Sequence, residues 1–299
     1  ILRCLVGSEM CIRDRLYTYY TRCNLMMKKG ISSAFIALVL LFMYFPILII
    51  AVYSFTDAAN IGTISSFSLQ NYITLFTTEE LKDMILGSLL LAVGSAALAT
   101  ILGTLGAIGS FYSKKRTRTA MSVLNQVPVV NADVVTGFSL CILLVVVLGV
   151  SKDTYVPLVA GHVVLSAPFV YLAVIPKLKQ MDQSLYEAAL DLGASPAYAL
   201  WHVIIPQAAS GIVSGFVMAI TLSLDDYFVA TYTKPATFDT ISTYVVNATK
   251  GSQTQIKTAL WALSTIIFIL VVILEAAVNF APSGNGRRGG AGEETAIDE

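Results

Sequence analysis

Charged residues and paired cysteines are both scarce in this sequence, and each shortage excludes a class of protein. Charged residues make up 13% of the 299 residues, whereas hydrophobic residues make up 56%, which leaves too little polar surface to cover a soluble protein of this length. Lysine plus arginine and aspartate plus glutamate number 19 each, so the net charge gives no sign of a nucleic-acid partner. The four cysteines form no CxxC pair, and we expect neither a disulfide framework nor a metal site.

Catalytic motifs are missing as well. The sequence has no G-x-x-x-x-G-K-[ST] phosphate loop, so any ATP hydrolysis would have to come from another chain. It has no H-E-x-x-H motif, and its two histidines, His162 and His202, have no cysteine or second histidine close by in the sequence. We therefore predict a protein that is not an enzyme and binds no cofactor itself.

Long apolar runs are what the sequence does have. Six of them approach or exceed the ~20 residues that an α-helix needs to cross ~30 Å of hydrocarbon. They occupy residues 31–55, 84–111, 120–150, 154–176, 205–224 and 258–280. The third is interrupted by polar residues and a proline between Asn125 and Asp133, which predicts a tilted or broken helix that lines protein or water. The fold class is therefore an all-α integral membrane protein with six transmembrane helices.

Lysine and arginine favour one side of the membrane. With a cytoplasmic N-terminus, the inside segments hold Lys28, Lys29, Lys114, Lys115, Arg116, Arg118, Lys177, Lys179, Arg287 and Arg288, and the outside segments hold Lys82, Lys152, Lys234, Lys250 and Lys257. Cytoplasmic loops carry the excess of positive residues in membrane proteins. We therefore predict that both termini face the cytoplasm.

Both ends of the chain differ from the rest. Residues 1–25 begin with ILRCLVGSEMCIRDR, lack any periodicity and resemble translated adapter sequence, so we expect a non-native extension; a native cytoplasmic tail is the alternative. The first apolar run is too long for a signal peptide and no small-x-small cleavage site follows it. We expect residues 26–281 to form the six-span domain, and residues 282–299, rich in glycine, arginine and glutamate, to form a disordered cytoplasmic tail.

The segment between the fourth and fifth runs, residues 182–206, carries the most specific local pattern. Ser184 followed by Glu187 is a capping box that predicts the start of a helix. Apolar residues at helical spacing follow it, namely Leu185, Ala188, Ala189 and Leu192. Gly193 stands where a left-handed C-terminal cap is expected.

A second short helix is predicted after this glycine. Ser195 and Pro196 supply an N-cap and a first-turn proline, and Pro206 marks the beginning of the fifth span. The whole segment thus predicts a helix, a glycine turn and a helix on the cytoplasmic membrane surface. The stretch EAALDLGASPAYALWHVIIP resembles the EAA loop of ABC importer permeases, with Glu187, Ala188, Ala189, Gly193, Ala194, Ile204 and Pro206 at the matching positions.

This resemblance to the binding-protein-dependent, MetI-like permeases covers most of residues 31–280. It implies the type I ABC importer permease fold in a bacterial cell membrane, with ATP and Mg bound by a partner ATPase. It also implies that the ATPase-coupling residues are Glu187, Ala188, Ala189, Gly193, Ala194 and Pro206. The implied partners are a dimer of cytoplasmic ATPase subunits, a second homologous permease and an extracytoplasmic binding protein.

Within the family the resemblance is nearest to permeases for spermidine and putrescine, through residues 127–140, the loop and residues 223–232. The residues also favour a cationic substrate. An ionised carboxylate within a span costs roughly 2.5–3.5 kcal/mol on insertion scales, so Asp133 should face a polar path or a partner. Asp225 and Asp226 would lie near the outer mouth and attract a polycation. The alternatives are that Asp133 hydrogen-bonds across a helix interface and that the two neighbouring aspartates form an ordinary solvated helix end.

Other solutes and another class of transporter remain as alternatives. The same architecture could serve iron(III), an opine or a phosphonate, and acidic outer residues argue only slightly against an anion. A stand-alone secondary transporter or channel is more distant, because secondary carriers commonly show paired repeats and more spans. Neighbouring genes for an ATPase and a secreted binding protein would favour the importer.

Overall fold

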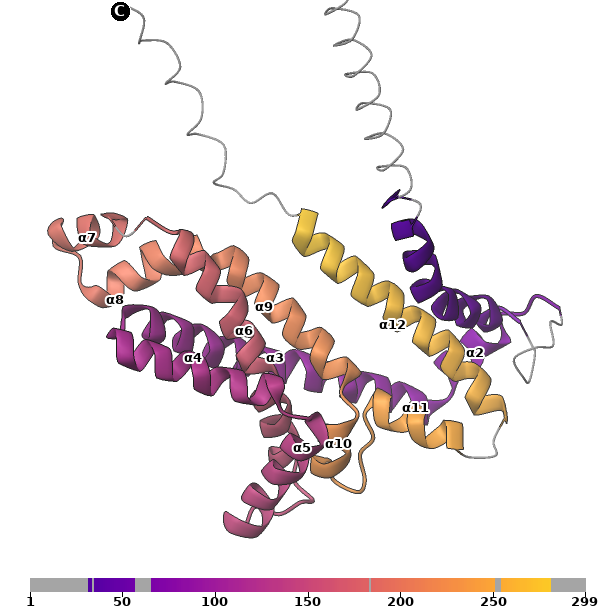
Figure 1. Cartoon of the computed structure of the whole chain (residues 1–299). Coiled ribbons are helices and arrows are strands. Elements are labelled where there is room, and N and C mark those ends of the chain that lie inside the picture. The colour runs from indigo at the N-terminus through magenta and orange to yellow at the C-terminus, as the bar shows by residue number, and fades with distance from the viewer. Residues whose placement is uncertain (1–31, 34, 57–65, 183, 251–253, 281–299) are drawn as a thin grey trace, which may run out of the picture.

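The computed structural model describes residues 32–33, 35–56, 66–182, 184–250 and 254–280 (Figure 1). These residues are almost entirely helical, and the one β-bridge among them joins Thr56 to Phe67. The N-terminal helix (Phe35–Ser54) is followed by α2 (Gln70–Thr77), α3 (Glu79–Tyr112), α4 (Lys115–Val130), α5 (Asp133–Cys141), η1 (Ile142–Val147), α6 (Val156–Gln180), α7 (Ser184–Asp191), α8 (Pro196–Ala199), η2 (Leu200–Ile204), α9 (Ile205–Asp225), α10 (Phe228–Thr233), α11 (Ile241–Lys250) and α12 (Thr254–Phe280). Our expectations for residues 1–25 and 282–299 lie outside the described residues.

The predicted spans correspond to long apolar helices. Within the described part, five helices are long and apolar enough to cross a membrane: the N-terminal helix, α3, α6, the continuous stretch Pro196–Asp225, and Thr258–Val278 of α12. The remaining predicted run, residues 120–150, is a pair of helices, Lys115–Val130 and Asp133–Val147, with a bend of 103° between them. The prediction of a broken third helix is therefore confirmed, and the total is five spans, or six if the bent pair counts as one.

Local chemistry accounts for this break. Pro128 lacks the N–H that would continue the helical hydrogen bonds, and Asn131 and Ala132 both adopt extended backbone angles. The side-chain amides of two asparagines near the break find partners inside the protein. Asn125 Nδ2 donates to the carbonyl oxygen of Pro168 in α6 at 3.2 Å, and Asn131 Nδ2 donates to Thr136 Oγ1 at 3.0 Å.

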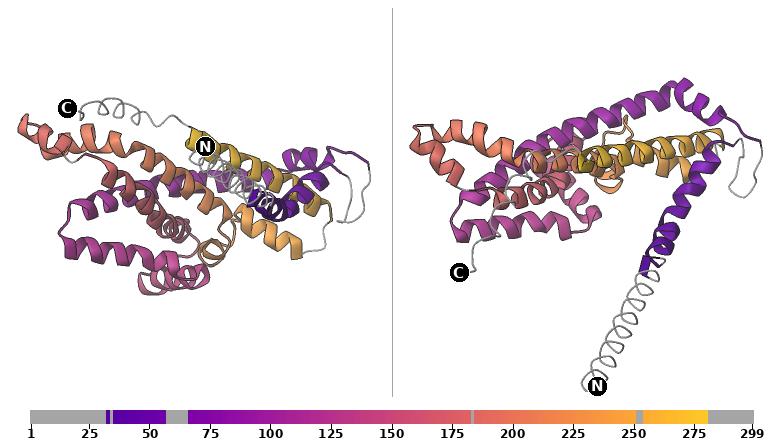
Figure 2. Two further views of the ribbon diagram at one scale, coloured as in Figure 1. Left: turned by 45° about the horizontal axis from the view of Figure 1, so that its top comes forward. Right: turned by 90° about the horizontal axis from the view of Figure 1, so that it is seen from above.

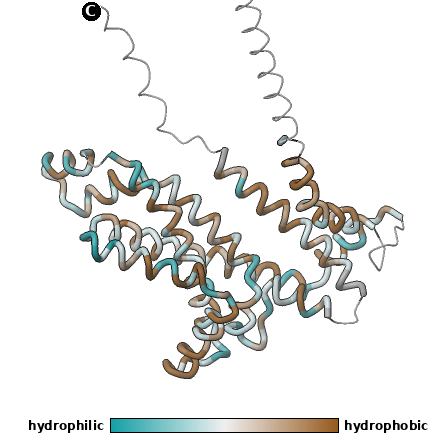
Figure 3. The backbone as a smooth tube through the Cα atoms, in the orientation of Figure 1, coloured by the Kyte–Doolittle hydropathy of each residue, from teal (hydrophilic) through white to brown (hydrophobic). Residues whose placement is uncertain are grey.

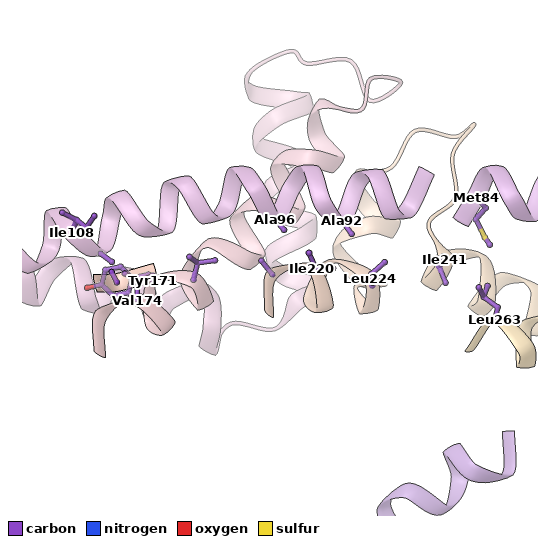
Figure 4. Close-up of a cluster of buried hydrophobic side chains, with 14 of the residues drawn as sticks. Met84, Ala92, Ala96, Ile108, Tyr171, Val174, Ile220, Leu224, Ile241 and Leu263 are labelled. Atoms are coloured by element: carbon purple, nitrogen blue, oxygen red, sulfur yellow. The ribbon is translucent and has the colours of Figure 1, made fainter. Parts of the chain in front are cut away.

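Helices α3, α6 and α9 pack against one another and form the centre of the molecule. Figure 4 shows apolar side chains of all three helices, such as Ile108, Val174 and Ile220, in one cluster. Small residues let the backbones approach. An added Cβ at Gly103 in α3 would lie 2.8 Å from the carbonyl oxygen of Ala167 in α6.

The N-terminal helix is apolar on all sides and mostly exposed (Figure 3). Its packing onto α12 includes a ring contact between Tyr44 and Phe268, with centroids 6.4 Å apart, and one between Tyr53 and Trp261 at 5.8 Å. In the view from above it points away from the central helices (Figure 2, right). A helix that is apolar on all sides is stable only where lipid or another helix surrounds it. The exposed surface of the N-terminal helix can therefore contact either one.

Candidate functional site

The loop between α6 and α9 stands at one end of the molecule, where α7 and α8 project beyond the central helices (Figure 1). Helix α7 ends as the sequence predicts. Gly193 has φ +86°, its N–H donates to the carbonyl oxygen of Leu190 at 2.9 Å, and the N–H of Ala194 donates to that of Ala189 at 3.0 Å. This pair of bonds is the Schellman arrangement, which requires a left-handed residue at the position of the glycine.

The start of α7 differs from the prediction. The side chain that accepts a backbone N–H belongs to Asp182, whose Oδ1 lies 2.9 Å from the nitrogen of Ser184. This hydrogen bond holds the pKa of Asp182 below its usual value. Ser184 is already helical, so the predicted capping box of Ser184 and Glu187 is wrong. Aspartate accepts backbone N–H groups at the start of a helix as well as serine does, and here Asp182, two residues before Ser184, accepts the N–H of the first helical residue.

The second predicted helix of the loop begins where the sequence predicts, but it is not a separate short helix. Ser195 Oγ accepts the N–H of Tyr198 at 3.3 Å, and Pro196 opens α8. The helix then continues through the π-helical turn η2 into α9, so Pro206 lies in the first turn of α9 without separating two helices. A π-helical turn is wider than an α-helical one, and it stands where the ring of Pro206 would otherwise meet a carbonyl of the preceding turn.

Helix α7 exposes most of the predicted apolar stripe. It rests on the end of α3 through Tyr186, whose ring centroid lies 5.2 Å from that of Tyr112. On the open side, Leu192 is 88% exposed, and Leu185 and Glu187 are exposed too. Leu185 and Leu192 therefore leave apolar surface at α7 that no other part of the described chain covers.

The three predicted pathway acids lie at the other end of α9. Asp225 is the last residue of α9, Asp226 follows it, and Asp133 is the first residue of α5. Helices α5 and α10 lie side by side (Figure 1). This contact brings Asp133 close enough to Asp226 for their charges to interact, and the charge of the neighbouring Asp225 acts on Asp226 as well. Asp133 and Asp225 are exposed, whereas Asp226 is buried.

Asp226 is held by the backbone of the helix that follows. Its Oδ1 accepts the N–H of Val229 at 3.1 Å and its Oδ2 accepts the N–H of Ala230 at 2.9 Å, which caps α10. Its own carbonyl oxygen accepts a short hydrogen bond from Ser242 Oγ in α11. The alternative of a solvated helix end is therefore wrong for Asp226, although it describes the exposure of Asp225.

Sequence reasoning missed a buried polar group beside Asp226. His162 in α6 is 0% exposed, and its Nδ1 lies 3.0 Å from Ser223 Oγ in α9. Ser223 Oγ in turn lies 3.3 Å from Ser95 Oγ in α3. The available signal was a histidine alone in an apolar run, which in a membrane span indicates a functional role by default. Among the described residues, no group of three His, Cys, Asp or Glu side chains could hold a metal ion.

Comparison with known proteins identifies relatives of this chain. Residues 99–280 match the family of binding-protein-dependent transport system inner membrane components. The spermidine/putrescine transport system permease protein PotC of Haemophilus influenzae is 29% identical over 248 residues, which are 83% of this chain and 96% of PotC. The putrescine transport system permease protein PotI of Escherichia coli K12 is 30% identical over 196 residues, which are 64% of this chain and 70% of PotI.

Solved structures share the fold. A bacterial ABC transporter involved in the import of the acidic polysaccharide alginate superposes with a TM-score of 0.67 at 18% identity, over 90% of this chain and 99% of that one. The MetNI methionine ABC transporter superposes with a TM-score of 0.51 at 14% identity, over 68% of this chain and 98% of that one. The family match and the shared architecture show that this chain belongs to the binding-protein-dependent transport system inner membrane components, the MetI-like permeases of the bacterial inner membrane.

Proposed function

We propose that this permease carries polyamines, spermidine or putrescine, as a subunit of an ATP-driven importer. Its relatives PotC and PotI are named as permeases for these compounds. The structural observation that supports a polycation is that the exposed carboxylates of Asp133 and Asp225 both lie close enough to Asp226 for their charges to act on it, at one end of the central helices. Nearby, Lys234 is paired with Asp239 at 2.8 Å, so this lysine is not free to neutralise the two exposed acids. Carboxylates of one sign raise the local concentration of a cationic solute.

We further propose that the α7–α8 loop couples the permease to a cytoplasmic ATPase dimer. The residues assigned to this role are Glu187, Ala188, Ala189, Gly193, Ala194 and Pro206. The exposed stripe of α7 supports the assignment, since its leucines have no cover within the described chain. ATP and Mg belong to the ATPase under this proposal, and both termini share the cytoplasmic side with the loop.

Two more partners complete the proposed importer. A second, homologous permease would cover the exposed N-terminal helix, where side chains such as Phe42, 78% exposed, need apolar surroundings. An extracytoplasmic polyamine-binding protein would dock near Asp133 and Asp225. One of the alginate transporter structures is a complex with a substrate-bound periplasmic protein, which supports the same division of labour here.

The test is ATP-dependent uptake of radiolabelled spermidine and putrescine into proteoliposomes that contain this chain, the neighbouring permease, the ATPase and the binding protein. Glu187→Ala on α7 should abolish uptake and release the ATPase from the membrane. Asp153→Ala is the matched control, because Asp153 is an exposed acid in the loop before α6, away from α7. Its uptake should equal that of the wild type.

The outcomes separate the substrate from the coupling. If Glu187→Ala transports as well as the control, the role of the loop is wrong. If neither polyamine enters but another loaded binding protein stimulates the ATPase, the coupling stands and the substrate changes. Iron(III), an opine and a phosphonate are then the solutes to try first, since structures with the same fold import compounds as different as alginate and methionine.

A further inference from the structure

The two ring nitrogens of His162 face two different elements. Nδ1 meets Ser223 Oγ in α9 at 3.0 Å, while Nε2 lies 3.8 Å from Asp226 Oδ2 at the junction of α9 and α10. When Ser223 donates its hydroxyl proton to Nδ1, the ring proton sits on Nε2 and points toward the carboxylate. The side chains of His162 and Asp226 are 0% and 3% exposed, so water does not screen this interaction.

The contact of Nε2 with Asp226 is incomplete as a hydrogen bond. At 3.8 Å it exceeds the usual donor–acceptor distance of about 3 Å, and Nε2 is one of the buried side-chain atoms of the described part that have no hydrogen-bond partner. A buried donor without an acceptor is unfavourable. A shift of about 1 Å between α6 and the α9–α10 junction would complete the bond, so the position of the junction and this contact depend on each other.

The position of Asp226 determines the positions of the two exposed carboxylates, Asp225 and Asp133. Asp226 caps α10 through the N–H groups of Val229 and Ala230, and it directly follows Asp225. Helix α10 in turn positions α5, because the two backbones are in close contact: an added Cβ at Gly137 in α5 would lie 2.8 Å from Val229 Cα in α10. Asp133 is the first residue of α5. Movement of Asp226 therefore moves both Asp225 and Asp133.

The same two helices connect this junction to the α7–α8 loop. Helix α6 runs from the level of His162 to Gln180, just before α7, and the helix from Pro196 to Asp225 runs from α8 to the junction. Along their length the contact is between backbones: an added Cβ at Gly211 would lie 2.9 Å from the carbonyl oxygen of Ala173. Near the junction the contact becomes polar, through Ser223 and His162.

We propose that His162 is a positioning residue: the approach of its Nε2 to Asp226 Oδ2 at 3.8 Å sets the position of the α9–α10 junction, and thereby where Asp133 and Asp225 stand relative to α6. His162 itself does not touch the substrate, since it is fully buried. The proposal rests on the proposed function in assigning the two exposed carboxylates to a polycation. It gives the transport pathway a link, through α6 and α9, to the loop that faces the ATPase.

Two amide variants distinguish the two ring nitrogens. The amide of His162→Gln reaches the position of Nε2, whereas the amide of His162→Asn reaches that of Nδ1 and keeps only the bond to Ser223. Spin labels on Val164 in α6 and Thr231 in α10, both exposed, report the distance between the two helices by pulsed EPR. The labels are placed after the four native cysteines are replaced by alanine, in the full importer complex in nanodiscs.

His162→Gln should keep the narrow distance distribution of the wild type and most of its spermidine uptake. His162→Asn should broaden or shift the distribution and lower uptake about fivefold, the size of effect expected for a residue that couples two sites. If the two variants behave alike, or if Asn is the milder change, Nε2 has no positioning role. Should His162→Asn fail to assemble, His162→Gln decides by itself: a broadened or shifted distance distribution in an assembled His162→Gln complex would overturn the proposal.

Failure of the proposed function gives a different pattern. In that case the wild type imports neither spermidine nor putrescine, but the label distances still separate His162→Gln from His162→Asn. If spermidine enters normally and the distances do not separate the variants, the polyamine assignment stands and the role of His162 is wrong.

Discussion

Gly137 in α5 lies directly against Val229 in α10, where an added Cβ would stand 2.8 Å from the Val229 Cα. The neighbour is backbone, which cannot move aside as a flexible side chain can. This contact joins the helix that begins with Asp133 to the helix that Asp226 caps. The acids at this end of the molecule are therefore arranged by the close approach of two short helices.

Gly137→Ala should disturb that arrangement. Overpacking of a closely packed contact costs about 1–3 kcal/mol, and here the strain falls on α5 and α10, so spermidine uptake should drop while the variant still inserts and assembles. Uptake per assembled complex in proteoliposomes is the measurement. Gly94→Ala is the control, because nothing lies within 4 Å of an added Cβ at Gly94 in α3. Equal uptake by the two variants would contradict the role of this contact in positioning the acids.

The turn after α7 gives a second prediction. Gly193 has φ +86°, and a left-handed backbone costs roughly 1–2 kcal/mol for most other residues. Gly193→Ala should therefore displace α7 and reduce the amount of ATPase that co-purifies with the permease. Gly193→Asn should retain more of it, because asparagine tolerates this conformation better. If alanine and asparagine retain the ATPase equally, the left-handed turn is not what presents α7.

The loop could be predicted from the sequence because its signals are local. Gly193 and Ser195 fix their own turn and cap within a few residues, and the structure confirms both. The two errors have local causes as well. Asp182 accepts the N–H of Ser184, and the π-helical turn η2 joins the second short helix to α9, although Pro206 lies in the first turn of α9 as predicted.

The cluster of acids could be predicted only in part. The residue types Asp133, Asp225 and Asp226 indicated a polar site, but which of them is buried depends on where α10 folds back. The neighbour of Asp226 is equally non-local: His162 comes from α6, 64 residues earlier in the chain. Sequence periodicity predicts which residues share a helix face, and it does not predict how a 103° bend places one helix against another.

The neighbouring aspartates Asp225 and Asp226 should respond differently to the loss of their carboxylates. Asp225 is exposed, so Asp225→Ala should lower spermidine uptake, through the lost attraction for a polycation, and leave the thermal stability of the purified permease unchanged. Asp226 is buried and caps α10, so Asp226→Ala should destabilise the protein by about 0.5–2 kcal/mol, the usual cost of a lost N-cap. Asp226→Asn should recover most of that stability, because asparagine also caps helices. Thermal unfolding in detergent and uptake in proteoliposomes are measured on the same preparations, with Asp153→Ala as the exposed control. If Asp226→Ala is as stable as the wild type, the bonds of its carboxylate to α10 do not stabilise the protein. If Asp225→Ala unfolds earlier and transports normally, Asp225 has a structural role and does not attract the substrate.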